Sequence, residues 1–502
     1  MFEASFNGLV SVFTWPTFPL MMIGVVIGFI IGILPGISAP TTLALMLPFT
    51  FHMTPVEAFA FLLGMLSVSI MFGDITSILF GVPGEPLAAA VVLDGHAMAK
   101  NGETGRALGA ALMSSLIGSI IGALILAASI PIIRPVVLSF ASPEFFSLAL
   151  LGIAFVAALS GGNMTKGLLA GALGLMLSMV GQDPQSGTQR YTFGMLELWD
   201  GIGLVPVTVG LFGVGELVDL WVKQKSIAEQ KVGKIGGLWQ GCKDTFIHWG
   251  VTLRCSLLGT FLGIIPGLGG SVGQWVSYAH AVQSAKDKDR FGKGDVRGVL
   301  GPGASMQAKE GGNLITTVAF GVPSSVSMAI LLGAFLIQGL VPGPSMLTSK
   351  VELTLSFVWV IIVAHIISVA LCFLLINQMV KITEIRSALI LPSIVFLVLF
   401  GGYSDKNSLF DMAITLAAGF LGMIMVYLDW PRPPLILGLV LGRIVENNLF
   451  ISYSRYEFGF LTRPLVIVII IAAVGLLIAP ILQDRFARRL GVKEELILAE
   501  EG

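Results

Sequence analysis

The sequence has little charge for its length. Charged residues make up 12% of its 502 residues, and hydrophobic residues make up 55%. The mean hydropathy is +0.90, whereas a soluble domain is usually about a quarter charged. A chain with so little polar surface cannot cover itself in water, so lipid is expected to form part of its solvent. The formal net charge of -1 gives no indication of a nucleic-acid partner.

Cysteines and enzyme motifs are also scarce. The three cysteines, Cys242, Cys255 and Cys372, are far apart and form no C-x-x-C pair, so no disulfide framework or thiolate metal site is expected. The five histidines lack metal-binding spacing such as H-E-x-x-H. There is no P-loop and no G-x-S-x-G elbow. We therefore expect no cofactor and no ATPase activity, which leaves a gradient of Na⁺ or H⁺ as the energy source.

Basic residues are missing from the beginning of the chain, where the first is Lys100. Later they gather in three polar segments, residues 223–247, residues 284–297 and the C-terminal tail. The positive-inside rule places all three segments in the cytoplasm. The absence of Lys and Arg before Lys100 indicates that the N-terminus lies on the opposite, periplasmic side.

What the sequence does contain is long apolar runs, and a helix needs about 20 such residues to cross a membrane. Clear runs cover residues 108–133, 136–159, 168–180, 204–222, 351–376, 388–400, 413–427 and 465–482. Glycine and proline interrupt four others, residues 17–50, 56–99, 248–283 and 312–341. The predicted fold is an all-α polytopic membrane protein with about ten to twelve transmembrane helices.

Two motifs occur twice and in the same order. GILPGI at residues 32–37 recurs as GIIPGL at residues 263–268, and TSILFGVP at residues 76–83 recurs as TTVAFGVP at residues 316–323. Only the second copy has basic loops on both sides of its Pro-Gly segment, so the copies are expected to face opposite ways. This is the inverted-topology repeat of secondary transporters.

The repeat gives a domain plan for the chain. We expect a first membrane repeat at residues 1–222, a cytoplasmic linker at 223–247, a second membrane repeat at 248–483 and a cytoplasmic tail at 484–502. Each repeat would contain helices broken at Pro-Gly. Because both flanks of residues 248–283 are basic, that stretch is either two full spans or a re-entrant hairpin that turns at Pro266-Gly267.

Broken helices carry the functional prediction. Proline removes a backbone donor and glycine permits unusual backbone angles, and the freed groups are tolerated only inside protein or beside water. Half-helix N-termini can hold a carboxylate, and freed carbonyls can hold Na⁺. The predicted substrate-binding residues are Gly36, Ser38, Thr41, Thr42, Gly267, Gly269, Ser271, Asn313, Thr316, Thr317, Ser324 and Ser325. The predicted ion-binding residues are Asp74, Thr76, Ser77, Pro35 and Pro266. The alternative is that these small residues only let helices pack closely.

Ionisable residues at membrane depth are costly and therefore functional by default. Lys309 would meet either a substrate carboxylate or its neighbour Glu310. Arg443 and Glu446 are three apart on one helix, so we expect them to pair with each other. Asp94, Lys100 and Arg106 are expected to be anchors at the cytoplasmic end of a span.

Several runs of sequence resemble one known family. They are ILFGVPGEPLAAAVVLDGHAMAKNGETGRALG at residues 78–109, GILPGISAPTTLALMLP near the start and GIIPGLGGSVGQWVSYAHA in the second half. Together with Gly442, residues 446–449 and Arg463-Pro464, they resemble the large membrane subunit of the tripartite tricarboxylate transporter family. The resemblance implies a symporter subunit in a bacterial inner membrane, driven by a cation gradient that is commonly Na⁺. It also implies two partners, a small membrane subunit of about four spans and a periplasmic solute-binding protein that delivers a carboxylate.

One stretch departs from the family pattern, which has Pro-Glu followed by Asn-Asn. Residues 302–310 read PGASMQAKE, so Lys309 and Glu310 are additional charges. If this stretch lines the site, a carboxylate other than citrate, or a different ion coupling, is expected. Two alternative functions stay open from the residues alone. One is a membrane-embedded enzyme that acts on a lipid-linked substrate around Asp74 and Glu85, and the other is a lone channel or exporter.

Overall fold

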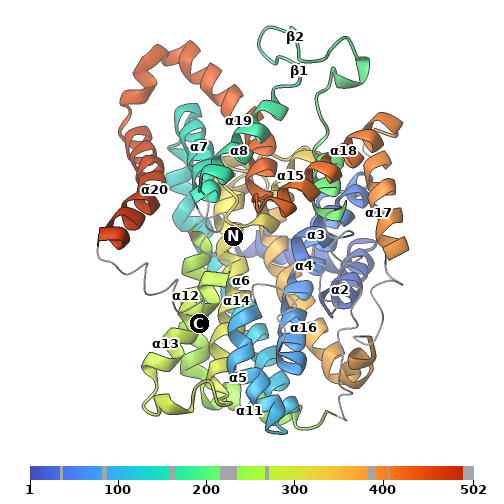
Figure 1. Cartoon of the computed structure of the whole chain (residues 1–502), viewed down its shortest axis with the longest axis vertical. Coiled ribbons are helices and arrows are strands. Elements are labelled where there is room, and N and C mark those ends of the chain that lie inside the picture. The colour runs from blue at the N-terminus through green and yellow to red at the C-terminus, as the bar shows by residue number, and fades with distance from the viewer. Residues whose placement is uncertain are drawn as a thin grey trace. The chain divides into compact units, whose positions relative to one another are not determined.

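The computed structural model describes residues 1–33, 38–81, 88–158, 164–214, 217, 235–265, 271–382, 391–404 and 406–489. These residues are almost entirely helical (Figure 1), and their one sheet is the antiparallel pair of β1 (Gly181–Gln182) and β2 (Gln189–Arg190). The all-α prediction is therefore confirmed. The chain forms two packing units, each described by itself. The first consists of Met1–Ser139 and Ile202–Arg432, and the second of Phe140–Gly201 and Pro433–Gly502.

The helices of the first unit follow the interrupted apolar runs. They are α1 (Phe2–Phe13), α2 (Thr17–Ile33), α3 (Ala39–Met46), η1 (Leu47–Thr50), α4 (Pro55–Phe80), α5 (Ala89–Lys100), α6 (Thr104–Leu138), α9 (Leu204–Val209), η4 (Gly210–Val214), α11 (Leu238–Ile247), α12 (Trp249–Ile264), α13 (Ser271–Ser284), η5 (Lys288–Arg290), α14 (Arg297–Phe320), α15 (Val326–Ile337), η6 (Pro344–Leu347), α16 (Val351–Ile382), α17 (Leu391–Ser404) and α18 (Leu409–Tyr427). The second unit contains α7 (Ser142–Ala158), α8 (Met164–Ser178), η3 (Leu196–Leu198), α19 (Pro433–Tyr456), η8 (Glu457–Thr462) and α20 (Pro464–Arg489).

Fewer helices are long enough to cross a membrane than the ten to twelve expected. Among the described residues, 5 helices are long and apolar enough, or up to 7 if each bent pair counts as one span. The bent pairs are α1 with α2, at 70°, and α11 with α12, at 79°. Several further apolar helices have only 10–17 residues. The difference arises because glycine and proline divide the apolar runs into pieces shorter than a full span.

The order of the elements repeats along the chain. A short helix, a sharp bend, a second helix and a Pro-Gly segment open both halves, as α1–α2 and as α11–α12. A short helix and a long one follow, α3 and α4 in the first half and α13 and α14 in the second. The sequence repeat is thus also a repeat of structure. Its boundaries at residues 222 and 248 stay a prediction, because the two packing units divide the chain elsewhere.

Glycines bring the long helices into direct backbone contact. A Cβ placed on Gly24, Gly28 or Gly32 of α2 would lie 2.2, 2.4 or 2.7 Å from a carbonyl oxygen of α4. In the second half, a Cβ on Gly259 or Gly263 of α12 would lie 2.4 or 2.3 Å from a carbonyl oxygen of α14. Small residues allow such close approach, and close packing rather than water drives association in lipid.

A neighbouring face of α14 is held against α6 in the same way. A Cβ on Gly118 or Gly122 of α6 would lie 2.1 or 2.3 Å from the carbonyl oxygen of Ala304 or Ala308. Gly311 of α14 likewise leaves room for the carbonyl oxygen of Gly122, which would lie 2.1 Å from an added Cβ. Helix α14 is therefore fixed between α6 and α12, and we call these three helices the glycine-packed block.

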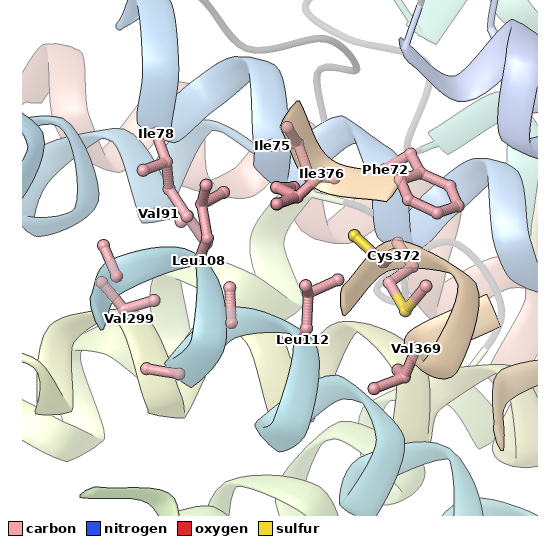
Figure 2. Close-up of a cluster of buried hydrophobic side chains, with 14 of the residues drawn as sticks. Phe72, Ile75, Ile78, Val91, Leu108, Leu112, Val299, Val369, Cys372 and Ile376 are labelled. Carbon is pink, nitrogen blue, oxygen red and sulfur yellow. The ribbon is translucent and has the colours of Figure 1, made fainter. Parts of the chain in front are cut away.

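A buried hydrophobic cluster joins the two halves of the first unit. The side chains that Figure 2 labels come from α4, α5, α6, α14 and α16, and Val25 and Phe29 of α2 also belong to the cluster. The labelled members are Phe72, Ile75, Ile78, Val91, Leu108, Leu112, Val299, Val369, Cys372 and Ile376. This cluster lies beside the last turns of α4, so it fixes the position of the first copy of the second repeated motif.

In the second unit, the expected pair of Arg443 with Glu446 is wrong. The carboxylate of Glu446 accepts two hydrogen bonds from Arg190, at 2.6 and 3.1 Å. Arg443 instead donates from Nη2 to the backbone oxygen of Asp200, at 2.9 Å. The loop that carries β1 and β2 brings Arg190 and Asp200 to α19, and helical spacing alone does not reveal these partners.

Candidate functional site

The second repeated motif ends a helix in the same way in both halves. Helix α4 ends at Gly81 and α14 at Gly321, and both glycines are left-handed, with φ of 69° and 67°. The amide of Gly81 donates to the carbonyl of Ser77, and the amide of Gly321 donates to the carbonyl of Thr317, both at 3.1 Å. Glycine is favoured at such a helix end because it has no Cβ to oppose the left-handed backbone.

The hydroxyl groups just before these helix ends make the same local bonds in both copies. Thr76 and Ser77 donate to the carbonyl of Gly73, at 3.0 and 2.9 Å. In the second copy, residues 316–317 donate to the carbonyl of Asn313, at 3.1 and 2.8 Å. Because the hydroxyl protons are used in this way, each oxygen offers a ligand only its lone pairs. Lone pairs suit a cation and not an anion.

The second copy also carries a buried polar cluster along α14. Ser324 donates to Oδ1 of Asn313 at 2.9 Å, and Nδ2 of Asn313 donates to Oε1 of Glu310 at 3.2 Å. The ammonium of Lys309 lies 3.8 Å from the same Glu310 oxygen. Lys309 and Glu310 are only 3% and 4% exposed. Within the described part of the chain, Oε2 of Glu310 has no hydrogen-bond partner, so this carboxylate can accept a further bond.

A histidine of α16 reaches the same helix. His365 is fully buried, with Nδ1 2.9 Å from the carbonyl of Ile361 and Nε2 3.1 Å from Oε1 of Gln307. The carbonyl can only accept, so Nδ1 carries a proton. A ring protonated on both nitrogens fits the Gln307 oxygen, whereas a neutral ring needs the amide turned so that its NH₂ group donates. The sequence analysis gave His365 no role, although its place inside the long apolar run at residues 351–376 was a signal for a functional one.

The first Pro-Gly break leads into α3. Ser38 is the N-cap of this helix, and its Oγ accepts from the Thr41 amide at 3.4 Å and lies 2.8 Å from the Thr41 hydroxyl. Thr42 donates to the Ser38 carbonyl at 3.1 Å. Thr41 and Thr42 are fully buried. These three predicted residues thus cap the positive end of α3, which follows directly on the Pro-Gly segment.

The remaining predicted residues are only partly covered by the described structure. Pro35, Gly36, Pro266, Gly267, Gly269 and Glu85 lie outside the described residues. Ser271 is the first residue of α13, and Ser325 is the N-cap of α15, where its Oγ accepts from the Met328 amide at 3.3 Å. The structure therefore brings Asn313, Thr316, Thr317 and Ser324 into one cluster. The assignment of the full set to substrate or ion stays a prediction.

The turn between α5 and α6 meets both basic loops. Asn101 donates to the carbonyl of Lys293 at 3.3 Å, and Arg106 pairs with Asp244 at 2.5 Å. Two of the three segments that the positive-inside rule assigns to the cytoplasm thus contact the same end of α5 and α6. Lys100 and Arg106 lie at this end of their helices, as expected of anchors.

The loop at residues 284–297 is closed by ion pairs. Arg297 donates to both oxygens of Asp295, at 2.9 and 2.7 Å, and lies 2.8 Å from Asp287. Burial acts to raise the pKa of Asp295, but the bonds from Arg297 outweigh it, and the pKa lies below its ordinary value. The loop therefore depends on the charged form of Asp295.

Comparison with known proteins gives one family. The sequence profile described as the tripartite tricarboxylate transporter TctA family matches residues 18–437. The chain is 33% identical over 427 residues, 85% of each chain, to an Agrobacterium vitis protein named "Uncharacterized 52.8 kDa protein in TAR-I ttuC' 3'region". It is 32% identical over 191 residues, 38% of this chain and 79% of the relative, to another A. vitis protein, "Uncharacterized protein in TAR-II ttuC' 3'region". No solved structure matches.

Proposed function

Because the chain belongs to the tripartite tricarboxylate transporter TctA family, we propose that it imports a di- or tricarboxylate by cation symport. The family makes it a membrane subunit of a bacterial transporter and not an enzyme, which removes the hypothesis of an enzyme for lipid-linked substrates. Family membership implies partner subunits and a binding protein. We propose that these are a small membrane subunit of about four spans and a periplasmic protein that delivers the carboxylate.

The observation that supports cation coupling is the matched pair of helix ends. Thr76 and Ser77 in one copy and residues 316–317 in the other present oxygen lone pairs beside a left-handed glycine. Na⁺ is a hard cation that prefers such oxygen ligands, and half-helix ends supply freed carbonyls beside them. Asp74 lies one turn or less before Thr76 and Ser77 and adds negative charge. The geometry therefore favours a cation at Thr316 and Thr317 as well as at Thr76 and Ser77.

The carboxylate needs proton donors and positive charge. The N-termini of α3 and α13, which follow the two Pro-Gly breaks, offer backbone N–H groups and a favourable helix dipole. Lys309 adds a buried ammonium next to Glu310. Since the family pattern lacks this charged pair, we propose a carboxylate other than citrate as the substrate.

Alternating access is supported by reciprocal packing of the two halves. Helix α1 of the first half packs against α16 of the second, and α11 of the second half packs against α6 of the first. Such an exchange is expected of two repeats related by a pseudo-two-fold axis. Together with the absence of Lys and Arg before Lys100, it favours inverted repeats. Residues 248–283 form helices of 16 and 14 residues that pack on each other, which favours a re-entrant hairpin over two full spans.

The test is uptake of labelled carboxylates in cells that carry all three components. We expect the variant Thr317→Val to raise the Na⁺ concentration for half-maximal uptake about tenfold or more, because a lost bond to a charged ligand is worth about 1.5–3 kcal/mol. The matched control is Thr415→Val, since Thr415 is also buried and makes the same local bond, to the carbonyl of Asp411 at 2.9 Å. Equal Na⁺ dependence in the two variants would contradict the proposed cation site.

A further inference from the structure

Helices α5 and α13, from different halves of the chain, are joined by two polar contacts. The amide of Ala90 donates to Oε1 of Gln274 at 3.3 Å, and the hydroxyl of Tyr278 donates to Oδ2 of Asp94 at 2.9 Å. The partners are one helical turn apart on both helices, so both contacts lie on the same two faces. Each helix directly follows one of the repeated motif segments, and these contacts therefore link the two halves of the candidate site.

Asp94 extends this link to the beginning of α14. It is fully buried, and its Oδ1 accepts from the amides of Gly294 and Asp295, both at 2.9 Å. Charge-assisted bonds of this kind are stronger than neutral ones. A single carboxylate of α5 thus holds both α13 and the loop that enters α14. We call Asp94, Tyr278, Gln274 and Ala90 the polar latch.

The equivalent contact in the other half has different chemistry. Counted from the aligned motifs, Ala90 and Asp94 correspond to Ile330 and Ala334 of α15, and Gln274 and Tyr278 correspond to Leu43 and Leu47 of α3 and η1. All four counterparts are buried and apolar, and α3 packs against α15. A bond from Gln338 to the carbonyl of Thr50 lies beyond the end of α15.

This difference decides which contact separates more easily. Opening the contact of α3 with α15 would expose apolar side chains to water, which is unfavourable in proportion to their area. Opening the polar latch exchanges hydrogen bonds between helices for hydrogen bonds to water, and this exchange has a small net cost. We propose that the polar latch is the gate that opens toward the side of loop 284–297, with Asp94 and Gln274 as the residues that position it. This inference rests on the alternating access in the proposed function.

The chain contains its own reporter for this movement. Cys255 of α12 is fully buried, and its Sγ lies 3.7 Å from the carbonyl of Ser277 on α13. A displacement of α13 would expose the thiol. The experiment measures the rate at which a membrane-permeant maleimide labels the full chain in membranes with its partner subunits. In the chain used for this experiment, Cys242 and Cys372 are replaced by serine, so that Cys255 is its single cysteine.

We expect Tyr278→Phe to increase the labelling rate of Cys255 about tenfold or more, because it removes a hydrogen bond to a charged group. Asp94→Asn, which keeps the size of the side chain, should increase the rate further. The matched control is Ser284→Ala, because the hydroxyl of Ser284 bonds within α13, to the carbonyl of Ala281 at 3.2 Å. Its labelling rate should equal that of the parent chain.

Three results would overturn the gate. The first is an equal labelling rate in Tyr278→Phe and Ser284→Ala. The second uses a chain that retains only Cys372, which is buried in the hydrophobic cluster. If Tyr278→Phe increases the labelling rate of Cys372 as much as that of Cys255, the substitution has loosened the whole fold. The third is loss of carboxylate uptake in Tyr278→Phe with unchanged labelling of Cys255. The proposed import of a carboxylate, in contrast, fails if the parent chain itself imports no carboxylate.

Discussion

The contact between α2 and α4 gives the sharpest prediction for stability. In Gly28→Ala, the new Cβ would lie 2.4 Å from the carbonyl oxygen of Met65. Non-bonded carbon contacts are most favourable at about 3.5–4.0 Å, so α2 would have to move away from α4 by about 1 Å. Because the opposing atom belongs to the backbone, no side-chain rotation relieves the clash. Overpacking of this kind typically costs about 1–3 kcal/mol.

The matched control is Gly250→Ala, because a Cβ on Gly250 of α12 meets no atom within 4 Å. Both variants gain the helix propensity of alanine, about 1 kcal/mol, so the gain cancels in the comparison. The free energy of unfolding, measured by SDS titration of the purified subunit in mixed micelles, should be about 1–3 kcal/mol lower for Gly28→Ala. Gly263→Ala should behave like Gly28→Ala, since its new Cβ would lie 2.3 Å from the backbone carbonyl oxygen of Lys309. Equal stability of Gly28→Ala and Gly250→Ala would refute the reasoning.

Two further predictions concern the polar segments. The folded-state pKa of Asp295 lies below its ordinary value of 3.8, so its contribution to stability is present above that pH and is lost as the pH falls through the folded pKa. Cleavage of the surrounding loop by pepsin should therefore increase below about pH 4, and Asp295→Asn should show fast cleavage throughout. Glu446→Gln removes the charged partner of Arg190 and should speed trypsin cleavage after Arg190 about tenfold. An unchanged rate of trypsin cleavage after Arg190 in Glu446→Gln, or the same increase in the control Glu197→Gln at an exposed site, would contradict this account.

The parts of the fold that the sequence predicted are those with local causes. The two helix ends at Gly81 and Gly321 are set by one glycine and by hydroxyl groups within one turn. Such patterns are written in a few consecutive residues, so their repetition along the chain correctly indicated a repeated structure. The all-α class likewise followed from composition and apolar runs.

The parts that the sequence did not predict depend on contacts between distant residues. Glu446 pairs with Arg190 and not with Arg443, because a loop between other helices brings Arg190 to it. Asp94 was expected to be an anchor, yet it bonds to a loop two hundred positions away, at Gly294. The expected ten to twelve spans also exceed the 5, or up to 7, found among the described residues, because apolar runs do not show where Pro-Gly breaks turn the chain.

The glycine-packed block has a consequence for how a cargo would travel. Where the backbones lie against each other across α6, α14 and α12, only small side chains such as Ser305 and Thr260 stand between the helices, so rotamer changes would do little to let one helix slide past another. Under the proposed alternating access, we expect these three helices to shift as one piece, together with Asn313 and its neighbours. Such a carrier would keep the coordination of its cargo constant and exchange the surroundings instead. Its selectivity would then be decided once, on entry, and the same contacts would accompany the cargo until release.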